Sequence, residues 1–163
     1  MLIIEYIAPL MKQVILLGTG ALTTLRIFFL TLLFSLPLGL LIALARMSPR
    51  KWLSAPVKLF ILIMRGTPLI LQLIFFYFAP AAILPEGLRF TLPRFSAAVL
   101  AFSLNYAAYF AEIYRGGIES IPQGQYEAAA VLGFTKSQTF FRIILPQVIK
   151  RILPPVSNEV ITL

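Results

Sequence analysis

The sequence predicts an all-α integral membrane protein, and its composition, its low charge and its apolar runs support this fold class. Of its 163 residues, 60% are hydrophobic and 12% are charged, whereas soluble domains carry roughly 25% charged residues. A soluble domain near this size still exposes roughly 30% of the surface of its unfolded chain, which is too much for so apolar a sequence. Because the runs are solidly apolar and do not alternate over about ten residues, helices are predicted rather than a closed barrel.

Four apolar stretches have the length that a bilayer requires, which is about 20 residues for roughly 30 Å of hydrocarbon. They are predicted as spans at about 27–45, 59–78, 95–114 and 143–163 of a single transmembrane domain that covers 1–163. The second stretch is interrupted at 65–68. Because the fourth is still running at Leu163, the chain is expected to be truncated before its last span. Residues 1–25 are interpreted as an amphipathic helix that lies on, or dips into, the outer face.

The basic residues predict the orientation, because cytoplasmic loops of membrane proteins carry an excess of Lys and Arg. With the N-terminus outside, the larger group of basic residues is cytoplasmic, the smaller group is external, and Arg65 lies near an interface. The cytoplasmic group is Arg46, Arg50, Lys51, Lys58, Arg115, Lys136, Arg142, Lys150 and Arg151, and the external group is Lys12, Arg26, Arg89 and Arg94. The net charge of +8 is therefore attributed to orientation in lipid and not to nucleic acid binding, since no basic patch interleaved with aromatic residues is present.

The residue types that are missing exclude several kinds of chemistry. The sequence contains no Cys, no His and no Asp, so thiolate nucleophiles, disulfides, imidazole bases and thiolate metal sites are excluded. No glycine begins the G-x-x-x-x-G-K-[ST] loop that a nucleotide-hydrolysing subunit needs. Neither a catalytic residue, a metal site nor a cofactor is predicted for this chain.

The segment 115–142 is predicted to be a cytoplasmic loop in which two helices meet at a glycine turn. Pro122 suits the first turn of a helix, and Gly133 suits a left-handed C-terminal cap. Thr135 and Gln138 have the spacing of a capping box, which starts a second helix that passes Ile143 and Ile144 before it reaches Pro146. On composition alone, an ordinary surface helix with a turn is the favoured explanation of this segment.

The spacing of residues in this loop is more specific than its composition. Glu127-Ala128-Ala129, Gly133, Ile143 and Leu145-Pro146 match the pattern E-A-A-x(3)-G-x(9)-I-x-L-P at every fixed position. The pattern resembles the cytoplasmic signature of the permease subunits of bacterial ATP-binding-cassette importers. Further elements resemble the polar amino acid uptake branch, namely Arg65-Gly66-Thr67-Pro68, the Leu-rich run with Gln72, Asn105-Tyr106, Ala111-Glu112-Ile113, Arg115-Gly116-Gly117 and Ser157-Asn158-Glu159. The resemblance covers roughly residues 18–163.

The resemblance implies a type I importer-like helix bundle in a bacterial inner membrane, which forms the translocation pathway of an ATP-driven importer of polar amino acids. Such permeases pair as two identical or paralogous subunits with two ABC ATPase subunits, and they receive substrate from an extracytoplasmic amino-acid-binding protein. ATP and Mg²⁺ are then used by the separate ATPase, so this chain is expected to be a transport subunit and not an enzyme. The residues on the signature, expected to contact the ATPase, are Glu127, Ala128, Ala129 and Gly133.

Polar side chains within the predicted spans are candidates for a substrate pathway, because ionisable groups inside a membrane are costly. Asn105, Tyr109 and Glu112 share one helix face, since they are four and three residues apart. For Asn105 and Gln72 the favoured alternative is a hydrogen bond between helices, and for Glu112 it is a local ion pair with Arg115. The predicted pathway residues are Asn105, Tyr109, Asn158 and Glu159.

Two other functions remain open on the residues alone. The first is a membrane-embedded enzyme acting on a lipid or a lipid-linked substrate, for which Glu112 and Arg115 are the only nearby candidate pair. The second is a scaffold that recruits a soluble partner through the same cytoplasmic loop. Turnover by the isolated subunit would support the enzyme, and substrate-dependent flux in vesicles would exclude the scaffold.

Overall fold

The computed structural model describes residues 2–163, with side chains from residue 11 onward, and confirms the all-α prediction for this part of the chain. A 3₁₀ turn, η1, and a π-helical segment, η2, accompany the α-helices. In order, the elements are α1 (Leu2–Arg46), α2 (Lys51–Gly66), α3 (Leu69–Ile83), η1 (Glu86–Leu88), α4 (Arg94–Glu119), α5 (Gln123–Val131), α6 (Lys136–Gln138), η2 (Thr139–Ile144) and α7 (Leu145–Thr162).

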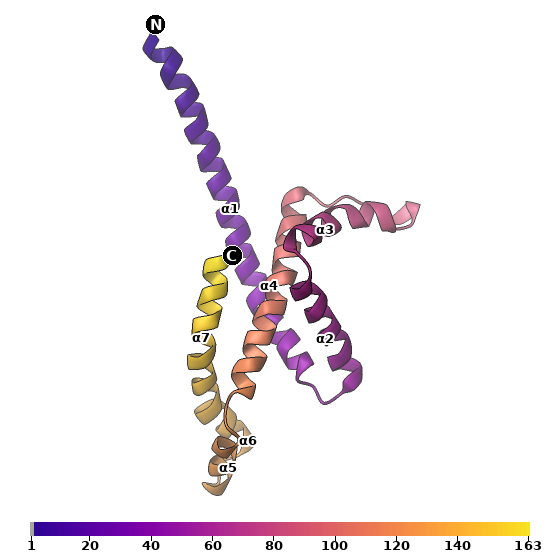
Figure 1. Cartoon of the computed structure of the whole chain (residues 1–163), viewed down its shortest axis with the longest axis vertical. Helices are drawn as coiled ribbons and strands as arrows, with labels where there is room; N and C mark the ends of the chain where they lie inside the picture. Colours follow the sequence, from indigo (N-terminus) through magenta and orange to yellow (C-terminus); the bar gives the residue numbers. More distant parts are fainter. Residues whose placement is uncertain (1) are drawn as a thin grey trace.

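Helix α4 occupies the centre of the bundle, where it contacts α1, α2, α3 and α7 (Figure 1). Helices α1 and α4 run in the same direction, and α2 and α7 run in the opposite one. The turn between α1 and α2 and the short helices α5 and α6 therefore lie toward one end of the molecule, and the N-terminus lies at the other. This arrangement puts both loops that the basic residues assign to the cytoplasm at the same end.

Helix α1 packs against α4 through small residues that recur every fourth position. Thr31, Ser35 and Ala43 are fully buried, and Gly39 falls at the same spacing. A Cβ atom on Gly39 would lie 2.8 Å from Cβ of Phe110 and 3.1 Å from a carbonyl oxygen of α4. Small residues let membrane helices approach closely and gain van der Waals contact, so this stripe fixes how α1 crosses α4.

The interpretation of residues 1–25 as a separate helix on the outer face is wrong for the described residues, because α1 is one helix from Leu2 to Arg46. Gly18 and Gly20 lower helix stability by about 1 kcal/mol each but do not interrupt it. The Thr19 and Thr23 hydroxyls donate to carbonyl oxygens of the preceding turn, so these polar groups are satisfied within the helix. Side chains 11–26 are exposed, and this half of α1 extends beyond the bundle (Figure 1).

The second apolar stretch, predicted at 59–78, consists of two helices and not of one straight span. Helices α2 and α3 meet at an angle of 113° across Thr67 and Pro68. Proline lacks the N–H that a helix needs at this point, and it disfavours helical geometry in the preceding residue. The interruption at 65–68 that the sequence indicates is therefore a sharp change of direction.

By length and composition, one described helical stretch is apolar enough to cross a membrane, Met11–Arg46, and the bent pair α2–α3 passes the same test when taken together. Helices α4 and α7 carry polar residues such as Asn105, Glu112 and Glu159 along their length, which lowers their mean hydropathy. Their assignment as membrane spans remains a prediction from the sequence.

Candidate coupling segment and polar clusters of the bundle

The shape of α5 is set by its two ends. Pro122 precedes its first residue in an extended conformation, with φ −58° and ψ 139°. At the other end Gly133 has a positive φ of 77°, and no other described residue does. The N–H of Phe134 donates to Ala129 O and the N–H of Gly133 donates to Ala130 O, both at 3.0 Å. This pair of bonds is a Schellman motif, so the left-handed cap predicted at Gly133 is confirmed.

The predicted capping box is also confirmed at the next helix. The Thr135 hydroxyl accepts from the N–H of Gln138, and the Gln138 side chain accepts from the N–H of Thr135. The helix that starts here continues through η2 and past Pro146 into α7. The wider π-helical turn, in which Leu145 N–H donates to Phe140 O, accommodates a proline that would otherwise clash with the carbonyl four residues before it.

The coupling segment, which we define as residues 120–144, is fastened to the bundle by an apolar cluster and by polar bonds. Ile121, Ile144 and Val148 are buried together, and partly buried side chains from the ends of α4, α5 and α7 surround them. The Arg151 guanidinium donates to Ser120 O. Because α4 continues to Glu119, the first residues of the predicted loop 115–142 are helical.

The structure separates the four predicted ATPase-contact residues into two kinds. Glu127 and Ala128 are exposed, as a docking surface requires. Ala129 is 1% exposed, so its side chain packs within the chain, and Gly133 has its conformational role in the cap. Val131 and Leu132 are 87% and 73% exposed and were not predicted, although an apolar pair beside the signature alanines is visible in the sequence.

A cluster of polar side chains supplies hydrogen-bond donors at the break between α2 and α3. The carbonyl of Met64 would bond to the N–H of residue 68 in a continuous helix, but residue 68 is proline and has none. Gln72 Nε2 donates to Met64 O at 2.9 Å, and Asn105 Nδ2 donates to the same oxygen at 3.0 Å. Asn105 Nδ2 also donates to Gln72 Oε1 at 3.0 Å. The bond between helices that the sequence favours for Gln72 and Asn105 is present, and it satisfies an orphaned carbonyl.

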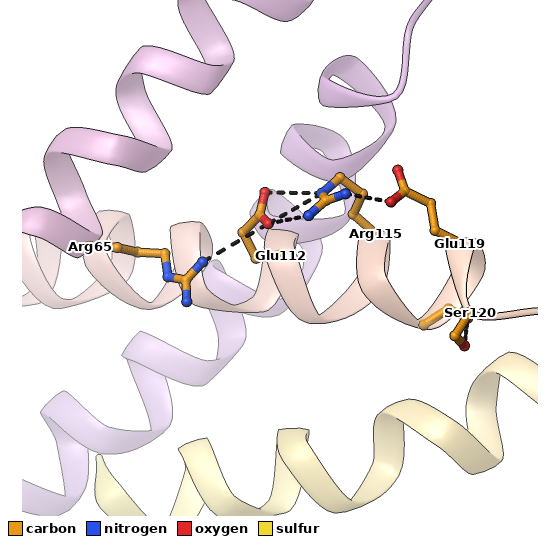
Figure 2. A network of polar contacts seen from close by, with 6 residues as sticks. Arg65, Glu112, Arg115, Glu119 and Ser120 are labelled. Carbon is orange, nitrogen blue, oxygen red and sulfur yellow. Dashed lines mark hydrogen bonds and ion pairs between the residues drawn. The ribbon is translucent and has the colours of Figure 1, made fainter.

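A chain of alternating charges follows α4 toward the coupling segment (Figure 2). Arg115 Nη2 lies 2.6 Å from Glu112 Oε2, and its other terminal nitrogen pairs with Glu119. Glu112 also lies 4.0 Å from Arg65 Nη1 on α2. The Arg65 guanidinium carbon lies 5.1 Å from the centre of the Tyr109 ring, a cation–π geometry. The local pairing of Glu112 with Arg115 is as predicted, whereas nothing in the sequence links Arg65 to α4.

The four predicted pathway residues lie in two different settings. Asn105 is 6% exposed and hydrogen-bonded, and Tyr109 is half-buried beside Arg65. Asn158 is exposed and Glu159 half-buried in the last turns of α7. Within the described residues, neither of these two side chains makes a hydrogen bond or an ion pair. The two settings belong to α4 and α7, which are adjacent helices.

Known proteins resemble this chain over most of its length. Residues 35–163 match the family described as binding-protein-dependent transport system inner membrane component. The L-cystine transport system permease protein TcyB of Bacillus subtilis is 43% identical over 90% of this chain and 61% of its own length. The putative glutamine transport system permease protein GlnP of Rickettsia bellii is 37% identical over 98% of this chain and 71% of its own. A crystal structure of an amino acid ABC transporter superimposes with a TM-score of 0.80 at 38% identity, covering 94% of this chain and 70% of that one.

The helical bundle and these likenesses define a permease-type membrane subunit. The chain belongs to the family of binding-protein-dependent transport system inner membrane components. It spans about 61% of the length of TcyB and about 71% of the length of GlnP.

Proposed function

We propose that the protein is the membrane permease subunit of an ATP-driven importer of polar amino acids, and that α5 is the element that contacts the ATPase. One observation carries the second part. Helix α5 begins after Pro122, ends in the left-handed cap at Gly133 and lies at the end of the molecule away from the N-terminus. Its exposed residues include Glu127, Ala128, Val131 and Leu132. A short helix with an exposed, partly apolar face suits a groove on another protein.

The attachment of α5 explains how a movement of the ATPase would reach the membrane helices. The cluster around Ile121, Ile144 and Val148 joins the coupling segment to α4 and to α7. Packed interiors transmit displacement because they are as dense as organic crystals. A rigid-body shift of α5 therefore moves the lower ends of α4 and α7 together, and these are the helices that carry the proposed pathway residues.

The partners and the substrate class are proposed from the relatives. Their names assign transport of L-cystine, glutamine and arginine to those proteins, and all three are polar amino acids. We extend to this chain a pairing with a second permease subunit, two ATPases that use ATP and Mg²⁺, and an extracytoplasmic binding protein. The N-terminus is then outside, and the basic loop at Arg50 and Lys51 is cytoplasmic.

A translocation pathway between α4 and α7 is the proposed role of Asn105, Tyr109, Asn158 and Glu159. A zwitterionic substrate needs an acceptor for its ammonium group, and Glu159 is the one carboxylate among these residues. Asn105 is engaged with Met64 O and Gln72, so its part in the pathway would be to hold the break at α2–α3 in place. Glu159→Gln is expected to raise the KM for transport more than it lowers the maximal rate.

The contact with the ATPase is testable by cross-linking, because the sequence contains no cysteine. Single variants Ala128→Cys and Val131→Cys of the intact permease are expected to cross-link to the ATPase subunit. Arg89→Cys lies in the loop that connects α3 to the N-terminal end of α4, whereas α5 follows the C-terminal end of α4. This variant is the control and is expected to give no such product. Cross-linking from Arg89→Cys but not from α5 would contradict the proposal.

A second experiment tests whether the charge of Glu127 contributes to the proposed contact with the ATPase. Glu127 is exposed and makes no ion pair with another described residue, so Glu127→Lys is expected to leave folding of the permease unchanged. It is expected to reduce co-purification of the ATPase and substrate-stimulated ATP hydrolysis, whereas Lys136→Glu on the neighbouring α6 should have a smaller effect. Unchanged association and transport in Glu127→Lys would exclude this residue from the contact.

A further inference from the structure

A basic hollow opens between the C-terminal end of α1, the C-terminal half of α2 and the side of α4. Its volume is about 320 Å³, and it is lined by three cations, one carboxylate, two aliphatic side chains and a glycine. These are Arg46, Lys58, Arg65, Glu112, Ile61, Leu62 and Gly66. Of these lining residues, only Arg65 and Glu112 belong to the charge chain described above. The other lining residues have no role in it.

The positive charge of the hollow is not balanced from within the chain. Its one carboxylate, Glu112, is held by two nitrogens of Arg115, at 2.6 Å and 3.2 Å, and Arg65 reaches it only at 4.0 Å. Among the described residues, neither Arg46 nor Lys58 has a carboxylate within ion-pair distance. Two cations that face one cavity without a counterion repel each other, and this favours an anion between them.

One side of the hollow lies next to the turn between α1 and α2, which is predicted to lie at the membrane interface. Arg46 ends α1, and Lys58 lies seven residues, about 10 Å, along α2 from Lys51 at the turn. Trp52, 71% exposed at the same turn, is of the type that anchors helices at a membrane interface. Leu62 is 66% exposed at the rim of the hollow. An occupant therefore meets both cations and an aliphatic surface.

We propose that this hollow binds the phosphate of an anionic phospholipid from the leaflet at the coupling end, with Arg46 and Lys58 as its main ligands. A phosphodiester supplies the missing negative charge, and the acyl chains of the same molecule lie against Leu62 and the apolar faces of α1 and α2. Basic pockets between membrane helices bind acidic headgroups in this way. A free phosphate would satisfy the cations but would leave the aliphatic rim uncovered. This proposal does not depend on the role of α5.

Native mass spectrometry of the intact permease complex tests the proposal. The complex is exchanged into nanodiscs of phosphatidylglycerol with phosphatidylcholine and then released, and the lipids retained are counted. We expect phosphatidylglycerol to be retained in preference to phosphatidylcholine. We expect occupancy to fall about fivefold for each charge removed in Arg46→Gln and Lys58→Gln, in line with the contribution of one basic residue at an anionic surface. Lys58→Arg keeps the charge and is expected to retain the lipid.

Lys136→Gln is the matched control, because Lys136 is an exposed lysine of the coupling segment outside the hollow. Equal loss of lipid in Lys136→Gln and Lys58→Gln would overturn the proposal, because it would indicate a diffuse charge effect. Equal retention of the two lipids by the unaltered complex would also overturn it, whatever the variants do. Full displacement of the lipid by millimolar inorganic phosphate would assign the hollow to a soluble anion and would likewise reject a lipid site.

Discussion

Two helix interruptions differ in how their free backbone carbonyls find hydrogen-bond donors. One is the α2–α3 break, and the other is the joint between α5 and α6. At the joint the carbonyls of Ala129 and Ala130 bond to backbone N–H groups of the next few residues, and Thr135 caps the following helix. At the break the carbonyl of Met64 depends on side chains 8 and 41 residues away along the chain.

This difference follows from the surroundings. The joint lies at the end of the molecule, where its partners are local and water can assist. The break lies beside the middle of α4, where Gln72 and Asn105 are buried, and a free backbone carbonyl there needs a partner within the protein. A helix interruption of this second kind is stable only when another helix brings the missing donor, so the bend of α2–α3 and the position of α4 depend on each other.

The variant with the largest expected effect, Gly117→Val, tests how the joint between α5 and α6 is attached to the bundle. A Cβ atom on Gly117 would lie 2.2 Å from Ile152 Cγ2 and 3.5 Å from Val148 Cγ1, so Gly117→Val is expected to separate α4 from α7. We expect a loss of about 3 kcal/mol in the free energy of unfolding, measured in detergent with the intact permease. Gly116→Val is the control, since nothing lies within 4 Å of a Cβ at that position. Equal destabilisation by both variants would show that the packing of α7 on α4 is not as described.

The variant with the next largest expected effect, Asn105→Leu, tests the α2–α3 break itself. Asn105→Leu removes a donor from Met64 O and leaves Gln72 Oε1 without its partner in a buried site. The expected loss is about 2 kcal/mol in the free energy of unfolding, the cost of an unsatisfied buried polar group. Gln123→Leu, on the exposed start of α5, removes an amide that bridges no helices and is expected to change stability little. A thermal unfolding midpoint equal to that of the unaltered protein would mean that the break does not need α4.

A smaller effect is expected at the joint, where the conformation of a single residue is at issue. Gly133→Ala places a Cβ in the left-handed region at φ 77°, which costs about 1 kcal/mol. Gly124→Ala, in the first turn of α5 and equally free of neighbours, is expected to be neutral or stabilising by up to about 1 kcal/mol. Hydrogen exchange of the α5 amides would detect both changes. Faster exchange in Gly124→Ala than in Gly133→Ala would contradict the assignment of the cap.

The smallest effect is expected from the end of the charge chain. Glu119 is 54% exposed and pairs with Arg115 one turn away, and such helix-surface pairs contribute at most about 0.5 kcal/mol. Glu119→Gln is therefore expected to leave the unfolding midpoint almost unchanged, and the remaining difference is expected to vanish at 1 M salt. A larger loss that persists in salt would show that the charge chain stabilises the bundle beyond its local geometry.

The amino-acid sequence by itself determined the all-helical class, the interruption before Pro68, the cap at Gly133, the capping box at Thr135 and the pair Glu112–Arg115. The fold class follows from the composition and the long apolar runs. Each of the other features depends on residues within a few positions of one another, so the chemistry of a short segment decides it. The family signature Glu127-Ala128-Ala129 could be recognised in the same way.

Only the tertiary structure decided the rest. The angle of 113° between α2 and α3 depends on contacts with α4. The donation of Asn105 to Met64 O and the position of Arg65 over Tyr109 join residues that are far apart in the chain. So does the burial of Ala129, which periodicity alone could not distinguish from the exposure of Ala128. The physical reason is that contacts between helices depend on how two surfaces fit together, and neither surface carries that information alone.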